Sequence, residues 1–342
     1  MAINLQEKFL KIILYFIILF LIFSVLFCYF SRSESSEEIS ASVYVSEKPL
    51  HELLFLGDMM FDRGVEYQIA KNQNDFSYPF KKIKNLLTEE KIIVANLEGP
   101  INCAPAQFSD KSLKFSFDCR IAEKLSVFDL LSLANNHTFN TGENGLKETK
   151  KILASKGIKY IGHPFYLENC FLDYENLVFF AVNQTYPFNP LPEQVVEKLK
   201  EVSDDKFLIV LVHWGEEYQS ESNNSQKNLA RLLVDNGADL IIGGHSHTIQ
   251  EVEKYKNKLI FYSLGNFIFD QYFSIETQEN LGVSLKIFEN KLIFSLIPID
   301  SELSQPFVLE GKEKEQFLKE LSEKSGEDLR KDLEKGTIIL KH

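Results

Sequence analysis

Five short apolar segments of this chain each end near a side chain that can bind a metal ion. The segments are residues 53–56, 92–95, 130–134, 207–212 and 240–242, and the polar residues that follow them are Asp58, Glu98, Asn136, His213, and His245 with His247. Several segments lack polar alternation, as expected of strands buried on both faces of a sheet. Ligands of open α/β sheets bind at the carboxyl ends of such strands. The pattern therefore predicts an α/β fold with a polar site at one sheet edge.

Amphipathic stretches lie between these strands. Residues 143–156 and 226–236 have apolar side chains at helical spacing, and Gly157 and Gly237 follow them as expected of helix ends. With a sixth apolar segment at 259–264, the alternation predicts one layered α/β domain over residues 50–300. We expect residues 301–342 to form a charged helical extension that is interrupted at Gly326.

The amino terminus contains a long apolar run. Residues 12–30 include only one clearly polar residue, Ser24, and the segment counted from Phe9 is 22 residues long. A helix of that length spans about 33 Å, enough for a bilayer core of about 30 Å. A cleaved signal peptide would have a shorter run followed by small residues, and bulky Phe27 argues against a lipoprotein signal at Cys28. We therefore expect an uncleaved transmembrane anchor over residues 9–30.

Charges around this run predict its orientation. Lys8 and Lys11 precede most of it, whereas a Ser- and Glu-rich linker over residues 31–49 follows. The positive-inside rule then places a cytoplasmic tail, residues 1–8, inside and the large domain outside a single-pass cell membrane protein. Residues 1–32 carry a net charge of +2 within a chain total of −12, which leaves −14 for the remainder. Such an acidic domain is not expected to bind nucleic acid.

The polar residues at the strand ends suit one class of ligand. Carboxylates can bridge two cations, and neutral imidazoles suit zinc, manganese or iron, so we expect one or two divalent ions. Because ligation needs neutral imidazole, uptake is expected to weaken below about pH 6.5. Each of these motifs, taken alone, could have a structural role instead of binding metal. Gly57-Asp58 could form a turn, Asn135-Asn136 could cap the following helix, and His245 with His247 could be a hydrogen-bonded pair.

Six motifs in this order resemble a known family. They are GDMMFDRGV (57–65), NLEGPI (96–101), SLANNHTFNTG (132–142), VHWGEEY (212–218), GADLIIGGHSHTIQEVE (237–253) and FYSLGNFIFDQ (261–271). The pattern is similar to the CapA family of poly-gamma-glutamate capsule synthesis proteins, within the calcineurin-like metallophosphoesterase superfamily. The resemblance implies a metallophosphatase-like αββα layered domain and a role in capsule or poly-gamma-glutamate synthesis or export.

The resemblance also implies a site. It assigns one metal to Asp58, Glu98 and His247, and a second to Glu98, Asn136, His213 and His245, with Glu98 bridging the two. His137 is expected beside the cations as the catalytic proton donor or as a ligand of a substrate oxygen. Arg63 and Asn266 are candidate substrate-binding residues; the alternatives are a surface salt bridge for Arg63 and a strand cap for Asn266.

Three residues depart from the superfamily pattern. Met60 stands where a further metal-binding histidine is expected, Thr138 where an acid would orient His137, and Asn140 where an aspartate is often found. The departures leave two interpretations open. The chain is either a metal-dependent hydrolase, on a phosphoester or a polymer, or a non-catalytic assembly subunit whose metal cleft grips an anionic polymer. A phosphoesterase unrelated to capsule is a further alternative, and other capsule-synthesis membrane proteins are the expected partners.

Four smaller expectations concern three single residues and one pair of cysteines. Glu217 is a candidate supporting residue of the site, Trp214 is expected in the core, and Asp270 either lines the cleft or caps a strand. Cys103 and Cys119 lie 16 residues apart, and they either form a disulfide or remain two free thiols.

Overall fold

The structure is a computed structural model that describes residues 15, 17–24, 48–106, 108, 113–202 and 205–341. It divides into two compact units, Met1–Lys48 and Pro49–His342. In the first unit, residues 17–24 are helical, and most of the expected anchor, tail and linker lies outside the described residues. Among the described residues, no helix combines the length and the apolar character needed to cross a membrane.

The larger sheet of this unit has nine strands and mixed direction. Its order is β16 (Gln305–Val308), β15 (Lys291–Glu302), β14 (Asn280–Ile287), β1 (His51–Met59), β2 (Ile92–Leu97), β5 (Leu130–Ser132) and β6 (Lys159–Ile161), while β13 (Asn266–Ile268) pairs with β1 and β17 (Thr337–Lys341) with β15. Strands β1, β2, β5 and β6 are parallel. The carboxyl ends of these four strands therefore share one edge of the sheet.

The smaller sheet has six strands. Its order is β11 (Val252–Tyr255), β12 (Lys258–Phe261), β10 (Leu240–Gly244), β9 (Phe207–His213), β8 (Leu177–Asn183) and β7 (Phe171–Tyr174), and the central four are parallel. A short third pair joins β3 (Ile101–Asn102) to β4 (Phe117–Asp118). Each of the six apolar segments overlaps a strand of these two sheets, although the segments at 130–134 and 259–264 extend past the ends of β5 and β12.

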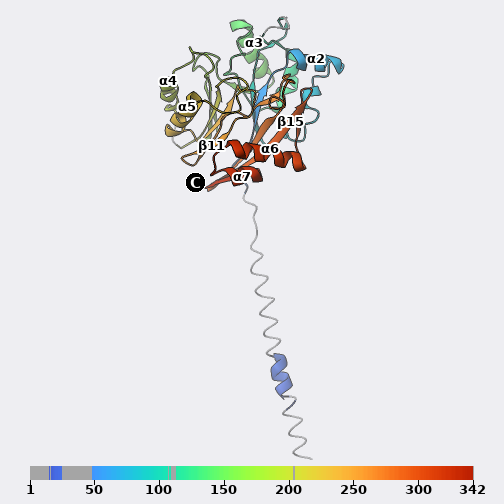
Figure 1. The fold of residues 1–342 in the computed structure, drawn as a ribbon, viewed down its shortest axis with the longest axis vertical. Coiled ribbons are helices and arrows are strands. Elements are labelled where there is room, and N and C mark those ends of the chain that lie inside the picture. The colour runs from blue at the N-terminus through green and yellow to red at the C-terminus, as the bar shows by residue number, and fades with distance from the viewer. Residues whose placement is uncertain are drawn as a thin grey trace, which may run out of the picture. The chain divides into compact units, whose positions relative to one another are not determined.

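The two sheets face each other across a shared core. Along β1, Leu53 and Phe55 pack with Phe179 of the other sheet, whereas Leu54 and Leu56 point to the opposite face. The helices are α2 (Arg63–Lys71), α3 (Gly142–Ser155), α4 (Pro192–Leu199), α5 (Asn224–Asp235), α6 (Gly311–Lys324) and α7 (Arg330–Lys335), with short 3-10 turns at Tyr78–Phe80, Cys119–Glu123 and Leu125–Val127. Helices α2 and α3 cover the outer face of the larger sheet, and α4 and α5 that of the smaller one (Figure 1).

The expected helices at 143–156 and 226–236 correspond to α3 and α5. Helix α5 begins with a reciprocal cap, in which the Asn223 side chain accepts from the Gln226 backbone and the Gln226 side chain accepts from the Asn223 backbone. Each amphipathic pattern thus becomes a helix whose apolar face covers a sheet.

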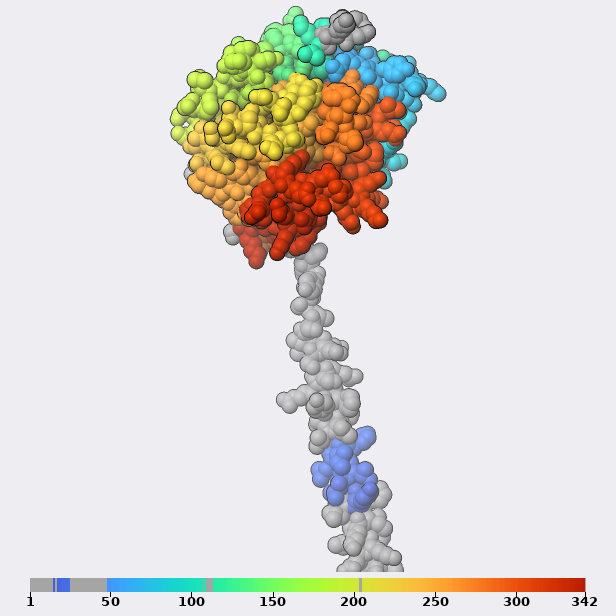
Figure 2. Space-filling model, in the orientation of Figure 1, coloured from blue at the N-terminus to red at the C-terminus, as the bar shows by residue number. Residues whose placement is uncertain are grey.

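The carboxyl-terminal segment differs from the expectation of a domain that ends at residue 300. Strand β15 continues to Glu302, and both β16 and β17 pair with it. The expected helices exist as α6 and α7, but Leu321 and Leu333 are buried in the core between the sheets. Figure 2 shows these red residues packed directly against the rest of the unit. Residues 301–341 therefore belong to the domain, because their strands pair with β15 and their leucines are buried in its core. The many charged residues on the exposed face of this segment made it resemble a separate extension in the sequence.

Candidate metal centre

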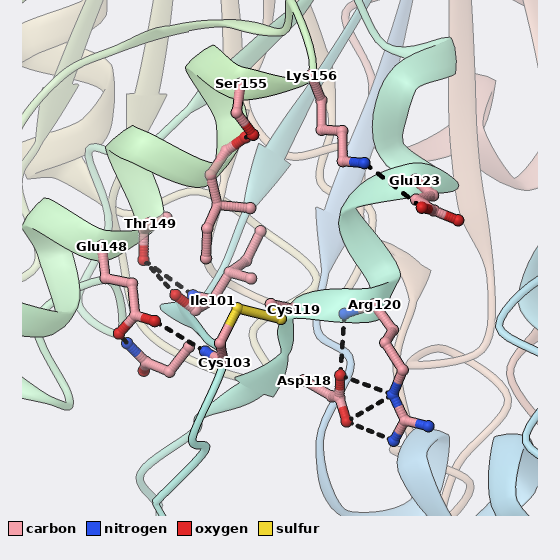
Figure 3. Close-up of a disulfide and its surroundings, with 12 residues drawn as sticks. Ile101, Cys103, Asp118, Cys119, Arg120, Glu123, Glu148, Thr149, Ser155 and Lys156 are labelled. Atoms are coloured by element: carbon pink, nitrogen blue, oxygen red, sulfur yellow. Dashed lines mark hydrogen bonds and ion pairs between the residues drawn. A yellow bond between two sulfur atoms is a disulfide. The ribbon is translucent and has the colours of Figure 1, made fainter.

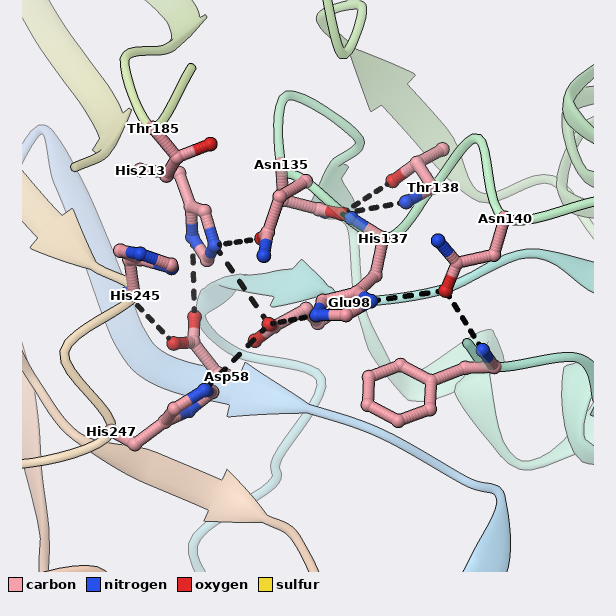
Figure 4. Close-up of polar contacts among 12 residues, drawn as sticks. Asp58, Glu98, Asn135, His137, Thr138, Asn140, Thr185, His213, His245 and His247 are labelled. Carbon is pink, nitrogen blue, oxygen red and sulfur yellow. Dashed lines mark hydrogen bonds and ion pairs between the residues drawn. The ribbon is translucent and has the colours of Figure 1, made fainter. Parts of the chain in front are cut away.

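The candidate ligands meet where strands of both sheets end (Figure 4). Asp58 lies near the end of β1 and Glu98 directly after β2, in the larger sheet. His213 ends β9, and His245 and His247 follow β10, in the smaller sheet. All five side chains are buried. The structure therefore joins, at one point, residues that are up to 189 positions apart in the chain.

The Glu98 carboxylate lies at the centre of this cluster without a hydrogen-bond partner. It is fully buried, and neither of its oxygens accepts a hydrogen bond. Burial, followed by the charge of Asp58, holds the pKa of Glu98 well above its usual value. An unpaired buried carboxylate is costly, and a cation would remove that cost. This side chain is therefore the strongest single indication of a metal site.

Two groups of ligand atoms share Glu98. One comprises Glu98, His213 and His245, and the other Asp58, Glu98 and His247; within each group the ligand atoms lie within 4.8 Å of one another. The Nε2 atoms of His213 and His247 lie 3.8 and 4.0 Å from Glu98 Oε1. His245 Nδ1 is buried and, like Glu98, has no hydrogen-bond partner. The groups have the composition that the family resemblance implies, and both suit a divalent ion.

Asn136, the remaining candidate ligand, lies beside the second group. Its Oδ1 atom is 2.9 Å from His213 Nε2, and its backbone carbonyl accepts a hydrogen bond of 2.9 Å from Tyr186 Oη. The tyrosine therefore fixes the backbone from which this amide points toward His213.

Burial decides the charge of the imidazoles. It lowers the pKa of His245 to about 4 and that of His247 to about 3, and it holds the pKa of His213 well below its usual value. These rings are therefore neutral at pH 7, the form that ligates metal. Burial also raises the pKa of Asp58 to about 6. Asp58 and Glu98 therefore join the groups from which a metal would have to displace protons, and the weakening of metal uptake below about pH 6.5 stays a prediction.

Asn96 supports the site, and the sequence analysis missed it. Its Nδ2 atom donates to Asp58 Oδ1 at 2.8 Å and lies 3.3 Å from His213 Nδ1. Its Oδ1 atom accepts from Asn135 Nδ2 at 3.0 Å. Asn96 therefore connects ligands from the two sheets. The available signal was an amide that interrupts the otherwise apolar strand β2.

The turn after β10 brings its backbone against Asp58. The His245 N–H donates to Asp58 Oδ2 at 2.9 Å, and a Cβ atom at Gly244 would lie 2.7 Å from Asp58 Oδ1. His245 and His247 both adopt left-handed backbone conformations, with φ values of 91° and 57°. The close approach of the Asp58 carboxylate explains the glycine at position 244, whereas a Cβ atom at Gly243 would lie 2.0 Å from the Tyr262 carbonyl oxygen.

His137 lies on the other side of Glu98. Its Nε2 atom is 3.7 Å from Glu98 Oε1, and its Nδ1 atom is 3.0 Å from Asn140 Oδ1. Thr138 does not orient the ring, because its hydroxyl donates to Asn135 Oδ1 at 2.7 Å. The orienting partner expected at position 138 is instead supplied by Asn140.

Met60 adds no ligand. Its Sδ atom accepts a hydrogen bond from Asp62 N at 2.9 Å, and its side chain packs in the apolar cluster beneath α2 and α3. The first ligand group therefore comprises Asp58, Glu98 and His247, as the departure from the superfamily pattern predicts.

The two candidate substrate residues have different positions. Arg63 lies at the rim, where Nε and Nη2 donate to Asp270 at 3.1 and 2.5 Å and its guanidinium stacks 4.8 Å from the Phe115 ring. Asn266 is buried, and its Oδ1 lies 2.9 Å from His247 Nδ1. Asn266 therefore orients the ring of a candidate ligand, a position closer to the alternative of a structural residue.

The remaining candidates have structural roles. Cys103 and Cys119 form a disulfide with a Cα–Cα distance of 4.7 Å, which resolves the alternative that the sequence left open (Figure 3). Trp214 is buried as expected, and its Nε1 donates to the Tyr262 carbonyl. The charge of Glu217 contributes to the raised pKa of Glu98, so this residue acts on the centre electrostatically.

Fold and site together define a layered α/β protein whose strand ends converge on a carboxylate–histidine cluster. A family model described as "Bacterial capsule synthesis protein PGA_cap" matches residues 52–169 and 176–271, and the chain belongs to this family. It is 29% identical to "Capsule biosynthesis protein CapA" of Bacillus anthracis over 74% of this chain and 68% of that protein. It is 28% identical to "PGA biosynthesis protein CapA" of Bacillus subtilis (strain 168), over 74% and 72%.

One solved structure similar to this chain is a hypothetical protein from Thermus thermophilus. It is 16% identical, has a TM-score of 0.41, and the match covers 75% of this chain and 98% of that one. At this score the likeness supports no conclusion about function.

Proposed function

We propose that this chain is a CapA-type protein that acts in capsule or poly-gamma-glutamate synthesis or export through a divalent-metal site. Family membership and the names of two relatives support the capsule role. The observation that carries the metal site is the buried Glu98 carboxylate, which has no hydrogen-bond partner and belongs to both groups of ligand atoms.

The proposed site holds one or two ions of manganese, iron or zinc, bound by the six ligands named above. A bound divalent ion would polarise a substrate oxygen and lower the pKa of water. The chain's own residues prepare the site: Asn96 and the His245 N–H hold Asp58, and Asn266 holds His247. His137 faces the centre with Nε2, which lies 3.7 Å from Glu98 Oε1.

We further propose that residues 9–30 anchor the protein in the cell membrane with the large domain outside the cytoplasm. The Cys103–Cys119 disulfide supports this placement independently of the apolar run. Disulfides persist in oxidising compartments and are rare in the cytosol, apart from transient or redox-active cases. The 19-residue linker and the −14 charge of the remaining chain are consistent with a domain held away from an anionic bilayer surface.

The retained ligands and the oriented His137 favour a metal-dependent hydrolase or transferase acting on a phosphoester or an amide-linked polymer. The buried Met60, which leaves the first ligand group one residue short of the superfamily pattern, favours an assembly subunit that uses the cleft for binding. In both cases the expected ligand is anionic, and other capsule-synthesis membrane proteins are the expected partners.

The first experiment replaces Glu98 by Gln in the full chain, with Glu253→Gln as the control. Glu253 lies on β11 outside the site, where it pairs with Arg231 and accepts a hydrogen bond from the Tyr262 hydroxyl. We expect Glu98→Gln to lose bound metal after reconstitution, as measured by elemental analysis, and Glu253→Gln to retain it. Equal metal content in both variants would contradict the proposed site. Normal polymer output in cells that lack the gene would contradict the capsule role.

A second experiment separates enzyme from assembly subunit. If the protein is an enzyme, His137→Ala lowers turnover by about 10²–10⁴-fold, the typical range for a general acid or base, while metal is retained. If it is an assembly subunit, cells with His137→Ala keep their polymer output, whereas deletion of residues 9–30 abolishes it. Loss of metal from His137→Ala would show that this ring is itself a ligand.

A further inference from the structure

The turn after β10, which carries His245 and His247, contains two strained residues. Both histidines have left-handed backbone conformations, with φ values of 91° and 57°. For residues other than glycine, such conformations cost free energy and persist only where surrounding contacts enforce them. Because the two rings are candidate ligands, the contacts that hold residues 245–252 also decide where the ligand atoms lie.

One set of these contacts comes from the loop after β9. The Tyr218 N–H donates to the Ser246 carbonyl at 2.7 Å, and the Thr248 hydroxyl donates to the Gln219 carbonyl at 2.8 Å. The side chains of residues 218–221 in this loop are exposed. Surface loops are more mobile than the strands and helices they connect, so this loop supplies only part of the support.

A second set of contacts comes from the end of helix α6. The Lys324 Nζ atom donates to the Ile249 carbonyl at 2.6 Å, and the Ser325 hydroxyl accepts from the Val252 N–H at 3.0 Å. Ile249 and Val252 are buried, and a buried backbone group without a partner is costly. The two side chains of α6 and its cap therefore satisfy the backbone that follows the histidines.

The surroundings of Lys324 suit a charged donor. Burial lowers the pKa of Lys324, and the charges of Glu279, Glu251 and Glu320 oppose that shift. These carboxylates favour the ammonium form, and a charged donor makes a stronger hydrogen bond than a neutral one. The contact with the Ile249 carbonyl is therefore the stronger of the two made by this end of the helix.

Helix α6 holds Lys324 and Ser325 at a fixed place. Phe317, Leu318 and Leu321 of this helix are buried in the core between the sheets, where close packing restricts movement. Both residues lie beyond residue 271, where the matched family segments end. One support of the turn therefore comes from a part of the chain outside those segments.

We propose that Lys324 and Ser325 are positioning residues of the metal centre, which hold the backbone at Ile249 and Val252 and thereby keep His245 and His247 in place for a divalent ion. The proposal rests on the proposed metal site and extends its support to the carboxyl-terminal segment. Ligands held in advance lose less conformational entropy when the ion binds. A role in packing alone would instead affect the stability of the domain and leave metal affinity unchanged.

The first experiment tests the turn without metal. Hydrogen exchange of the metal-free full chain in detergent is measured by mass spectrometry for Lys324→Met and for Lys319→Met as the control. Methionine keeps an apolar stem but donates no hydrogen bond. Lys319 lies on the same helix, is exposed, and pairs with Glu323 at 3.8 Å.

We expect amides of residues 245–252 to exchange about tenfold faster in Lys324→Met, the scale of one hydrogen bond to a charged group, and at the normal rate in Lys319→Met. Unchanged exchange of this segment in Lys324→Met would overturn the proposal. Equal acceleration in β9 would also overturn it, because it would indicate a general loss of stability rather than release of the turn.

The second experiment measures the affinity of the full chain for Co²⁺, whose visible absorption reports the geometry of its ligands. We expect Lys324→Met to bind Co²⁺ about tenfold more weakly and with an altered spectrum. Ser325→Ala, which removes the other contact, should change affinity in the same direction, and Lys319→Met should match the unmodified chain. A lower melting temperature with unchanged affinity and spectrum would show that Lys324 serves stability alone.

These results separate the inference from the proposed function. An unmodified chain that binds no Co²⁺, Mn²⁺ or Zn²⁺ would contradict the proposed metal site itself. Metal binding by the unmodified chain, with equal affinity and equal exchange of residues 245–252 in Lys324→Met, would contradict only the positioning role.

Discussion

The Oδ1 atom of Asn140 lies 3.0 Å from Nδ1 of His137, the ring nitrogen that faces away from Glu98. The same oxygen accepts the Phe115 N–H at 2.8 Å, which identifies it as the carbonyl end of the amide. His137 Nδ1 must therefore carry the hydrogen, and Nε2 presents a lone pair toward the centre. In the neutral ring, Nε2 is an acceptor, and it becomes a donor only after the ring gains a proton.

Replacement of Asn140 by Asp should raise the pKa of His137. Burial lowers this pKa to about 4 in the unmodified chain, and a carboxylate at Nδ1 would favour the protonated ring. We expect an increase of at least about one unit, measured by NMR titration of isotope-labelled histidine, with His137→Gln used to assign the signal. An unchanged pKa in the folded variant would contradict the orienting role.

Metal affinity should fall as the pH is lowered through about 6. Burial raises the pKa of Asp58 to about 6 and that of Glu98 well above its usual value, so both carboxyls gain protons as the pH falls. Metal must displace these protons, and binding should release them. Calorimetry in buffers of different ionisation enthalpy measures this release. Two results together would contradict this prediction: metal binds near pH 7 without releasing protons, and its affinity at about pH 5.5 equals that near pH 7. They would show that the two carboxyls do not bind protons in competition with the metal.

The two ions should bind with unequal affinity. The group of Asp58, Glu98 and His247 has no ligand from position 60, because the Met60 sulfur is directed to Asp62 N. We expect a chelator to remove one ion before the other in stepwise titration with elemental analysis. Met60→Leu should leave the removal of both ions by the chelator unchanged. As a near-isosteric core substitution, it should lower the free energy of unfolding by less than about 1.5 kcal/mol. Two ions lost together in the unmodified chain would contradict this difference.

Loss of the disulfide should destabilise the domain. Cys103 and Cys119 enclose a loop of 16 residues, for which chain entropy predicts about 3 kcal/mol. We expect the Cys103→Ser, Cys119→Ser double variant to unfold at lower urea concentration, and reducing agent to lower the stability of the unmodified chain but not that of the variant. The buried thiol of Cys170 serves as the internal control, because alkylation should reach it only after unfolding. Equal stability with and without reductant would show that the bond is not formed.

Much of the architecture followed from local patterns in the sequence. The six apolar segments became strands, and the helices at 143–156 and 226–236 formed as expected, because apolar periodicity and end signals act over a few residues. The strand β8 was missed although all seven of its residues are buried, since the Asn183-Gln184-Thr185 run at its end contains neither an acid nor a histidine. The antiparallel strands beyond residue 280 and the pairing of β17 with β15 were also missed, because pairing between distant segments leaves no local signal.

The sequence by itself determined which residue types stand at the ends of the buried strands: Asp58, Glu98, Asn136 and the three histidines from 213 to 247. Tertiary structure alone decided how those residues are used. The Glu98 carboxylate has no hydrogen-bond partner, and the Met60 side chain packs in the apolar cluster. Asn140 rather than Thr138 orients the His137 ring. Asn266 contacts the ring of His247. The physical reason is that hydrogen bonding and burial depend on neighbours brought together from both sheets, whereas a sequence motif specifies only the side chains and their spacing.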